Sequence, residues 1–365
     1  MMKTIQKKEK TWNIGVLSSI FAIVVGLLVG LVILLVSNPG QALQGFLTII
    51  TGGLTYDFMK GTGQVFYYAT PIICTGLALG FANKTGLFNI GASGQFILGA
   101  YAAIFVGIRF QSLGNVHWLV ALLAAAIAGG IWAMVPGLLK AFFNVNEVIA
   151  AIMMNYVGMY AVNLLVKSDS VVFDILKNQS APVASSAVIP KMGLDKIFPG
   201  SDINGGFIIA VLAVIVLHII LNKTTFGYEL KAVGYNRDAS KYAGINEKKS
   251  IVLSMVISGV LAGLGGGLLY LAGSGKHIEI VDMLADEGFT GISIALLGLN
   301  KPFGILAAAL FIAYVSYGGF YLQMYEYSTE VIDIIIAVII YFSAFALIVK
   351  NVIERRKAKK ERGEN

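Results

Sequence analysis

Charged side chains are scarce in this chain: they make up 13% of its 365 residues, whereas 57% are apolar. A soluble globular domain carries about 25% charged and roughly 45–50% apolar residues. This shortage of charge excludes a soluble domain and indicates a polytopic membrane protein. The formal net charge of +7 does not indicate a nucleic-acid partner, because lysine and arginine gather at the termini and in one loop, where membrane-orientation signals lie.

Cysteine and histidine are almost absent. The one cysteine, Cys74, lies in an apolar run, so it cannot form an internal disulfide and is expected to pack between helices. The three histidines, His117, His218 and His277, are scattered at the ends of apolar runs. Metal sites need ligands at short, regular spacings, so no metal site is expected.

Catalytic signatures are also absent. The segment Gly273–Lys276 ends in Gly-Lys like a phosphate-binding loop, but His277 follows in place of Ser or Thr, and the upstream glycine is missing. The chain is therefore not expected to be an ATPase. No nucleophile motif or carboxylate pair stands out, and we predict no catalytic residue and no enzymatic activity.

Ionisable residues within the apolar runs are few. Asp333 lies near one end of the last run, and Glu147 begins another directly after Asn146, which is also an ordinary helix-start signal. Carriers driven by ion gradients need ionisable groups inside the membrane. The composition thus counts against an ion-coupled secondary transporter, which stays open as an alternative.

Long apolar runs dominate what is present, and a membrane-spanning helix needs about 20 such residues. The first run is longer than a signal-peptide core, so it is predicted to be a retained span. Residues 40–59 are moderately apolar and are interpreted as a re-entrant or interfacial piece. We predict an all-α polytopic membrane protein with about ten glycine-rich, partly discontinuous spans at 14–36, 65–82, 88–108, 117–139, 147–166, 206–222, 250–272, 288–299, 303–321 and 331–349.

The distribution of positive charge predicts the orientation. Ten spans place both termini on one side, and that side then receives 20 of the 27 lysines and arginines. Because positive charge collects in the cytoplasm, both termini are predicted to be cytoplasmic. The expected parts are a cytoplasmic N-terminal segment (1–13), a transmembrane domain (14–349) with an outer loop (167–205) and a cytoplasmic loop (223–249), and a cytoplasmic basic tail (350–365).

The segment 86–107 combines apolar residues with Asn89, Ser93 and Gln95 and with five glycines. Polar groups inside a membrane tend to mark function, although they also join helices. Asn89 and Gln95 would lie about 120° apart on a regular helix. They can therefore share one narrow face only if the helix is broken or twisted at its glycines, as discontinuous helices in transporters are.

Two further patterns concern packing and docking. Gly259, Gly263 and Gly267 recur every four residues, a spacing that permits close helix crossing. Residues 228–243 have mixed polarity and few helix breakers, which predicts one short amphipathic helix at the membrane surface. A faint internal echo links Gly86-Leu-Phe-Asn-Ile90 with Gly288-Phe-Thr-Gly-Ile292, and each opens a glycine-rich span.

Three stretches carry a resemblance: GLFNIGASGQFILGAY from Gly86, NVNEVIAAIMMNYV at 144–157, and FGYELKAVGYNRDASKYAGI at 226–245. The chain resembles, over roughly 65–350, the permease subunits of bacterial ABC importers for ribose, other sugars, branched-chain amino acids and nucleosides. It is most similar to the nucleoside branch. A sugar or branched-chain amino acid permease remains the alternative within this family.

The resemblance implies a set of partners in a bacterial cell membrane. They are ABC ATPase subunits, a second permease that is a homologous but different chain, and an extracytoplasmic substrate-binding lipoprotein. The transported molecule would be a neutral nucleoside, and lipids would surround the spans. ATP would be used by the partner subunits, so this chain is expected to bind no cofactor and no nucleic acid.

Two groups of candidate residues follow. A neutral, polar, aromatic ligand calls for hydrogen-bonding and aromatic side chains, and the candidates for its path are Phe88, Asn89, Ser93, Gln95, Asn155 and Tyr156. The loop 226–245 is similar to the family's ATPase-coupling segment, and its candidates are Gly227, Ala232, Gly234, Asn236, Ala239 and Gly244.

Overall fold

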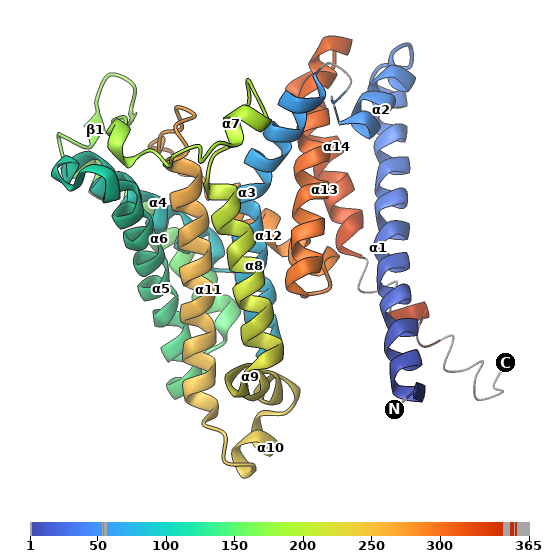
Figure 1. Ribbon diagram of the computed structural model, residues 1–365, viewed down its shortest axis with the longest axis vertical. Coiled ribbons are helices and arrows are strands. Elements are labelled where there is room, and N and C mark those ends of the chain that lie inside the picture. Colours follow the sequence, from blue (N-terminus) through green and yellow to red (C-terminus); the bar gives the residue numbers. More distant parts are fainter. Residues whose placement is uncertain (1, 53, 55–56, 346–350, 354, 356–365) are drawn as a thin grey trace.

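The computed structural model describes residues 2–52, 54, 57–345, 351–353 and 355 (Figure 1). The described chain is mainly helical, as predicted. Its α-helices are α1 (Met2–Ser37), α2 (Ala42–Thr51), α3 (Phe58–Lys84), α4 (Ala92–Arg109), α5 (His117–Phe143), α6 (Glu147–Ser168), α7 (Leu194–Ile197), α8 (Gly206–Lys223), α9 (Thr225–Tyr235), α10 (Arg237–Tyr242), α11 (Glu247–Tyr270), α12 (Asp286–Leu297), α13 (Pro302–Phe320) and α14 (Thr329–Ala344). The remaining elements are the 3-10 helices η1 (Gln111–Val116), η2 (Ser185–Ala187) and η3 (Tyr321–Tyr325) and the strands β1 (Phe173–Asp174) and β2 (Gln179–Ser180).

Within the described residues, eight helices are long and apolar enough to cross a membrane, and each coincides with a predicted span. The other two predicted spans are shorter. Helix α12 has 12 residues, or about 18 Å, which is too short to cross about 30 Å of hydrocarbon. Helix α14 is described to Ala344, and most of its predicted remainder lies outside the described residues. The polytopic all-α class with partly discontinuous spans is confirmed.

The ends of the predicted transmembrane domain are described only in part. Helix α1 begins at Met2, so the predicted N-terminal segment 1–13 is helical from its second residue and continuous with the first span. The predicted tail 350–365 lies largely outside the described residues. The stretch 40–59 contains the short apolar helix α2, which packs against α1 and α13 and ends at Gly52 in the left-handed conformation (φ 59°).

The bundle has two ends, which are named here by what they carry. The N-terminus of α1, α9 and α10 lie at one end, called the terminal face (Figure 1). The hairpin β1–β2, α7, α2 and η3 lie at the other end, called the opposite face (Figure 1). This arrangement places the predicted loops 167–205 and 223–249 at opposite ends of the bundle.

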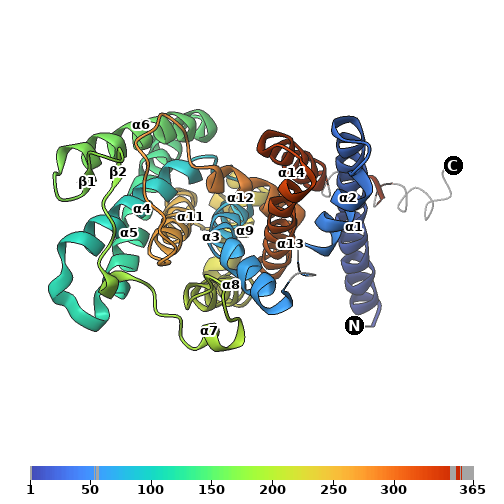
Figure 2. The ribbon, with the colours of Figure 1, turned by 90° about the horizontal axis from the view of Figure 1, so that it is seen from above.

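Helices α3 and α11 form the centre of the bundle (Figure 2). In the apolar 18-residue stretch of α3, 83% of the residues are buried, whereas in that of α1 22% are buried. Helix α11 packs against α3, α4 and α5. Gly129 of α5 lies directly on Gly259 and Gly263 of α11, where a Cβ atom on Gly129 would come within 2.9 Å of the Gly263 nitrogen. The glycine spacing in α11 therefore has the predicted packing role.

The opposite face is tied to the bundle by polar contacts. The buried imidazole of His117 bridges the Ser186 hydroxyl and the Val106 carbonyl oxygen, each at 2.9 Å. At the ends of α4 and α6, Arg109 donates two hydrogen bonds to the Asp169 carboxylate, at 2.6 and 3.2 Å. These hydrogen bonds hold the pKa of Asp169 below its usual range.

Candidate functional site

The chain is not helical between α3 and α4. Helix α3 ends at Lys84, Gly86 adopts a left-handed conformation (φ 73°), and α4 begins at Ala92. The prediction of one span from residue 88 is therefore wrong for its first turn. Irregular backbone at membrane depth must be buried in protein or line a cavity, so the contacts of this segment decide its role.

Asn89 lies within this break and Gln95 in the first turn of α4, and their side chains face each other. The Asn89 Nδ2 donates to Gln95 Oε1 at 2.8 Å, and Gln95 Nε2 donates to Asn89 Oδ1 at 3.0 Å. The Asn89 Nδ2 also lies 2.6 Å from the hydroxyl of Ser258, which donates to the Ala78 carbonyl oxygen at 2.7 Å. Both amides are buried, and together they join the start of α4 to α11 and α3.

Asn155 of α6 holds the same segment from the other side. Its Oδ1 accepts from the Gly94 backbone N–H at 2.8 Å, and its Nδ2 donates to the Ile90 carbonyl oxygen at 3.0 Å. The side chain thus satisfies one of the free N–H groups in the first turn of α4. Asn155 is the ninth of the 22 residues of α6, so α4 begins well inside the membrane-spanning region.

A second helix begins at the same level. The Ser93 hydroxyl donates to the carbonyl oxygen of Ala285, the residue before α12, at 2.8 Å. Gly288 lies against Ser93, where a Cβ atom would come 2.5 Å from the Ser93 Cα. Two helix N-termini therefore meet inside the bundle, as in transporters whose sites lie between discontinuous helices. The two echoed sequences, at Gly86 and Gly288, mark these two broken segments.

The predicted path residues fall into two groups. Asn89, Ser93, Gln95 and Asn155 are at most 1% exposed, and their side chains are hydrogen-bonded within the chain. They fix the start of α4 in this conformation, and Ser93 also joins it to the segment before α12. A role in contacting ligand stays a prediction. Phe88 is partly buried, whereas Tyr156 of α6 is 46% exposed.

Two exposed polar side chains lie in the middle turns of α6, Tyr156 and Tyr160. The large exposed side chains of α5 and α8 are aliphatic through their middle turns, as expected for a lipid-facing surface. In α6, by contrast, Tyr156 and Tyr160 are 46% and 55% exposed. Tyrosine favours the membrane interface over the hydrocarbon centre, which indicates that this part of α6 does not face lipid alone.

Helix α12 contributes to the same edge of the bundle as α6, between α6 and α14 (Figure 2). Its first turns expose Asp286 and Phe289 and half-bury Thr290. We call five residues of α6 and α12, exposed except for the half-buried Thr290, the path surface: Tyr156, Tyr160, Asp286, Phe289 and Thr290. Sequence reasoning found only Tyr156 among them. The i, i+4 tyrosine pair in an aliphatic span is the signal that could have revealed Tyr160.

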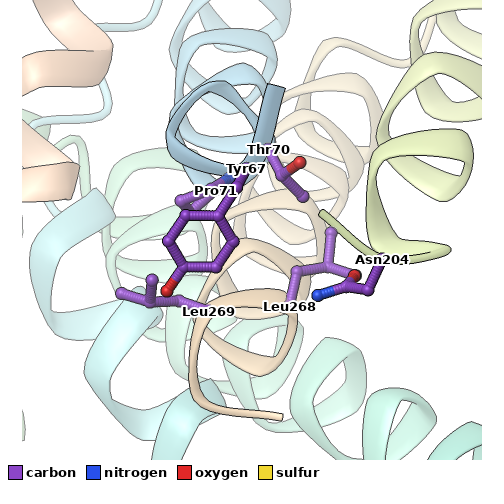
Figure 3. Close-up of a pocket in the computed structure, with 6 residues that line it drawn as sticks. All are labelled: Tyr67, Thr70, Pro71, Asn204, Leu268 and Leu269. Atoms are coloured by element: carbon purple, nitrogen blue, oxygen red, sulfur yellow. The ribbon is translucent and has the colours of Figure 1, made fainter. Parts of the chain in front are cut away.

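A small hollow lies beside Pro71 of α3 (Figure 3). Proline has no N–H to donate to the carbonyl four residues earlier, although α3 continues through it from Phe58 to Lys84. The hollow is lined by Tyr67, Thr70, Pro71, Asn204, Leu268 and Leu269, and its cavity volume is about 0 Å³. Small-molecule sites occupy roughly 300–1,000 Å³, so this hollow does not accommodate a nucleoside in this conformation.

The predicted single helix over 228–243 is wrong. Two helices, α9 and α10, are separated by Asn236, whose backbone is extended (φ −159°, ψ 110°). The Asn236 side chain accepts a hydrogen bond from the Ala239 N–H at 2.9 Å and so begins α10 as an N-cap. The cap signal was present in the sequence as Asn-Arg-Asp, and it divides the segment.

Two glycines of the predicted coupling group contact this chain itself. A Cβ atom on Gly227 would come 2.7 Å from the Leu221 Cα, and one on Gly234 would come 3.0 Å from the Gly86 nitrogen. Gly244 is exposed in a left-handed turn (φ 82°) after α10, and Ala239 is also exposed, whereas Ala232 is partly buried. The terminal face instead presents Tyr228, Tyr235 and Tyr242, which are 69%, 91% and 95% exposed.

Within the part of the chain that the structure describes, no three His, Cys, Asp or Glu side chains come together as they would around a metal ion. Cys74 is buried between helices.

Residues 61–344 match the family described as branched-chain amino acid transport system, permease component. The chain is 37% identical over 341 residues to the guanosine ABC transporter permease protein NupP of Bacillus subtilis. The aligned residues cover 93% of this chain and 96% of the relative. It is 33% identical to the nucleoside ABC transporter permease protein NupB of Lactococcus lactis, over 94% of both chains. A second guanosine permease of Bacillus subtilis, NupQ, is 30% identical over 68% of this chain and 77% of its own. No solved structure matches the chain.

Proposed function

Because this chain belongs to the family of permease components of branched-chain amino acid transport systems, as the resemblance indicated, we propose that it is the permease subunit of an ABC importer for nucleosides. The observation that carries the substrate assignment is the full-length similarity to two permeases named for guanosine and nucleosides. The path surface agrees with it, because tyrosine rings and hydroxyl groups suit a neutral ligand with an aromatic base and a polar sugar.

The importer would contain further subunits, as such importers do. ATP would be hydrolysed by separate ATPase subunits, so this chain would bind no cofactor. The similarity to both NupP and NupQ, two guanosine permeases of one organism, supports a second permease that is a different chain. The second permease would cover the edge that carries the path surface, and an extracytoplasmic binding protein would deliver the nucleoside.

Uptake measurements test the substrate assignment. We expect cells that carry the gene to accumulate labelled guanosine, and cells without it to lose this uptake. Unlabelled nucleosides should compete, whereas ribose and leucine should not, because they lack the base. Depletion of ATP should abolish uptake, whereas collapse of ion gradients at constant ATP should not. Uptake that followed the ion gradient would instead favour a secondary transporter.

The same assay locates the path. A Tyr156→Ala variant should lower uptake severalfold, because a mid-span ring would be lost from the path surface. Ile131→Ala is the control, since Ile131 is 58% exposed on the aliphatic side of α5. Equal uptake in the two variants would show that Tyr156 of α6 does not line the path. The substrate assignment would be unaffected.

Coupling to the ATPase is proposed to occur through α9 and α10. Exposed tyrosines are frequent anchors of protein interfaces, and three of them project from this part of the terminal face. We predict that Tyr235→Ala combined with Tyr242→Ala cuts substrate-stimulated ATP hydrolysis by the assembled complex about tenfold. Phe320→Ala is the control and should have no effect. It removes a ring that is 61% exposed at the last residue of α13, on the opposite face. Normal stimulation of ATP hydrolysis in the double tyrosine variant would show that residues 223–249 only connect two spans and do not couple to the ATPase.

Both termini are proposed to be cytoplasmic, because the positive charge collects on their side. A cysteine at Ser185 should react with an impermeant thiol reagent added outside intact cells, whereas one at Tyr242 should react only after the membrane is opened. Both positions are exposed, and the native Cys74 is buried and should stay silent. Ser240 would be a poor reporter, since it is 4% exposed. The reverse labelling pattern would overturn this orientation.

A further inference from the structure

The hairpin β1–β2 carries an apolar tip on the opposite face. Ile175 and Leu176 are 74% and 97% exposed. The tip lies beyond the ends of α5 and α6 (Figure 1), so it projects out of the span region rather than along it. Two neighbouring aliphatic side chains that are this exposed beyond the helix ends provide an apolar contact point for another molecule.

The hairpin tip is held in a defined shape. The Asp174 carboxylate accepts hydrogen bonds from the backbone N–H groups of Leu176 and Lys177, at 3.1 and 3.3 Å. Such a turn, in which a side chain replaces a backbone partner, fixes the chain locally. The buried Val172 at its base packs against the ends of α4 and α6. The apolar tip is therefore presented by a rigid support.

The base of the hairpin is joined to the loop that precedes α12. The Ser180 N–H donates to the Ile278 carbonyl oxygen at 2.8 Å, and the Ile278 N–H donates to Ser180 Oγ at 3.0 Å. Asn178 and Ile280 exchange two more hydrogen bonds, at 3.1 and 3.2 Å. Hairpin and loop thus form one small unit.

This unit leads to the path surface. The loop continues past Val281, whose carbonyl oxygen accepts from the Asn163 side chain of α6 at 3.1 Å, and reaches Ala285, which accepts from Ser93. The same stretch exposes Met283, which is 71% exposed. The apolar tip therefore stands beside the entrance to the edge where α6 and α12 present the path surface.

We propose that Ile175 and Leu176 form a docking point for the extracytoplasmic substrate-binding protein. This inference rests on the proposed function, which requires such a protein to sit over the entrance to the path. The occupant is taken to be a water-soluble protein rather than lipid, because the tip lies outside the spans and is followed directly by Lys177 and Asn178, without the tryptophan or tyrosine typical of membrane interfaces. Contact at the tip would reach the start of α12 through the hydrogen-bonded unit.

The test uses the complete importer in lipid nanodiscs with its purified binding protein. The double variant Ile175→Asp/Leu176→Asp should bind the binding protein at least about tenfold more weakly, with unchanged ATP hydrolysis in its absence. Leu176→Met is the matched control, because it keeps an apolar side chain and should bind normally. Affinity of the double variant within twofold of the wild type would overturn the proposal.

A fluorescent reporter on Leu176→Cys identifies the occupant directly. An environment-sensitive dye there should shift its emission to shorter wavelength when the binding protein is added, and not before. A dye already in an apolar environment in nanodiscs, or one that responds only to the second permease, would overturn the assignment. If the nucleoside-loaded binding protein does not stimulate ATP hydrolysis by the wild-type importer, the proposed function is contradicted. The dye reports docking of the binding protein independently of ATP hydrolysis, so the two failures can be told apart.

Discussion

Replacing Gly129 by valine is expected to leave little folded protein in the membrane. The Cβ atom alone would overlap the Gly259 carbonyl oxygen and come within 2.9 Å of the Gly263 backbone nitrogen. Because both neighbours are backbone, no rotamer change relieves the overlap, and α5 must move away from α11. Overpacking of a core costs about 1–3 kcal/mol, and we expect this substitution at about the upper end of that range.

The measurements are the amount of protein in isolated membranes and its midpoint of thermal unfolding in detergent. Ala128→Val is the matched control, since it adds two methyl groups at the neighbouring position of α5, which is partly exposed. The control should be obtained in normal amounts with a midpoint near that of the wild type. Equal behaviour of the two variants would show that the α5–α11 crossing is looser than the structure has it.

Asn89 and Gln95 should show strong energetic coupling. Asn89→Leu would leave the buried amide of Gln95 without its two partners, and an unsatisfied buried polar group costs about 1–3 kcal/mol. Gln95→Leu would remove the donor to Asn89 Oδ1 and one of the acceptors of Asn89 Nδ2, which keeps its contact with Ser258. When both are replaced, neither orphaned amide remains, so the double variant should be more stable than the sum of the single losses predicts, by about 1–2 kcal/mol.

This cycle distinguishes a packing pair from a pair that contacts water and ligand. In a water-filled path, solvent would take the place of the missing partner, and the two losses would simply add. Uptake measured on the same variants should fall in each single variant while the ATPase subunits still co-purify. If the stability losses of the two single variants add and uptake is lost, Asn89 and Gln95 contact water or ligand in the translocation path.

Local patterns in the sequence were sufficient for most of the helices. The apolar runs located the spans, and the helix-start signal at Asn146 is confirmed, since its side chain accepts hydrogen bonds from the N–H groups of Val148 and Ile149. The glycine spacing in α11 likewise indicated a close crossing. These features depend on residues near one another in the chain, which is why they could be predicted.

Contacts between distant segments could not be predicted in this way. The break before α4 is stabilised by Ser258 and Asn155, which follow it by 169 and 66 positions. The role of Gly234 was assigned to a partner protein, yet its nearest neighbours are residues 84–86 of the same chain. The exposure of Tyr160 likewise depends on which helices surround α6, and a single apolar run does not contain that information.

The contact between Gly234 and Gly86 has a mechanical consequence. A Cβ atom on Gly86 would lie 3.3 Å from the Gly234 Cα, so main chain rests on main chain with no side chain to bend or change rotamer between them. Such a joint is stiff, and a displacement of α9 is passed on with little loss. The segment that receives it contains Thr85, hydrogen-bonded to Ser254 at 2.8 Å, and leads directly to Asn89. A shift of α9 at the terminal face would therefore act on the start of α4, deep in the bundle, as well as on the ends of α8 and α11 that α9 contacts.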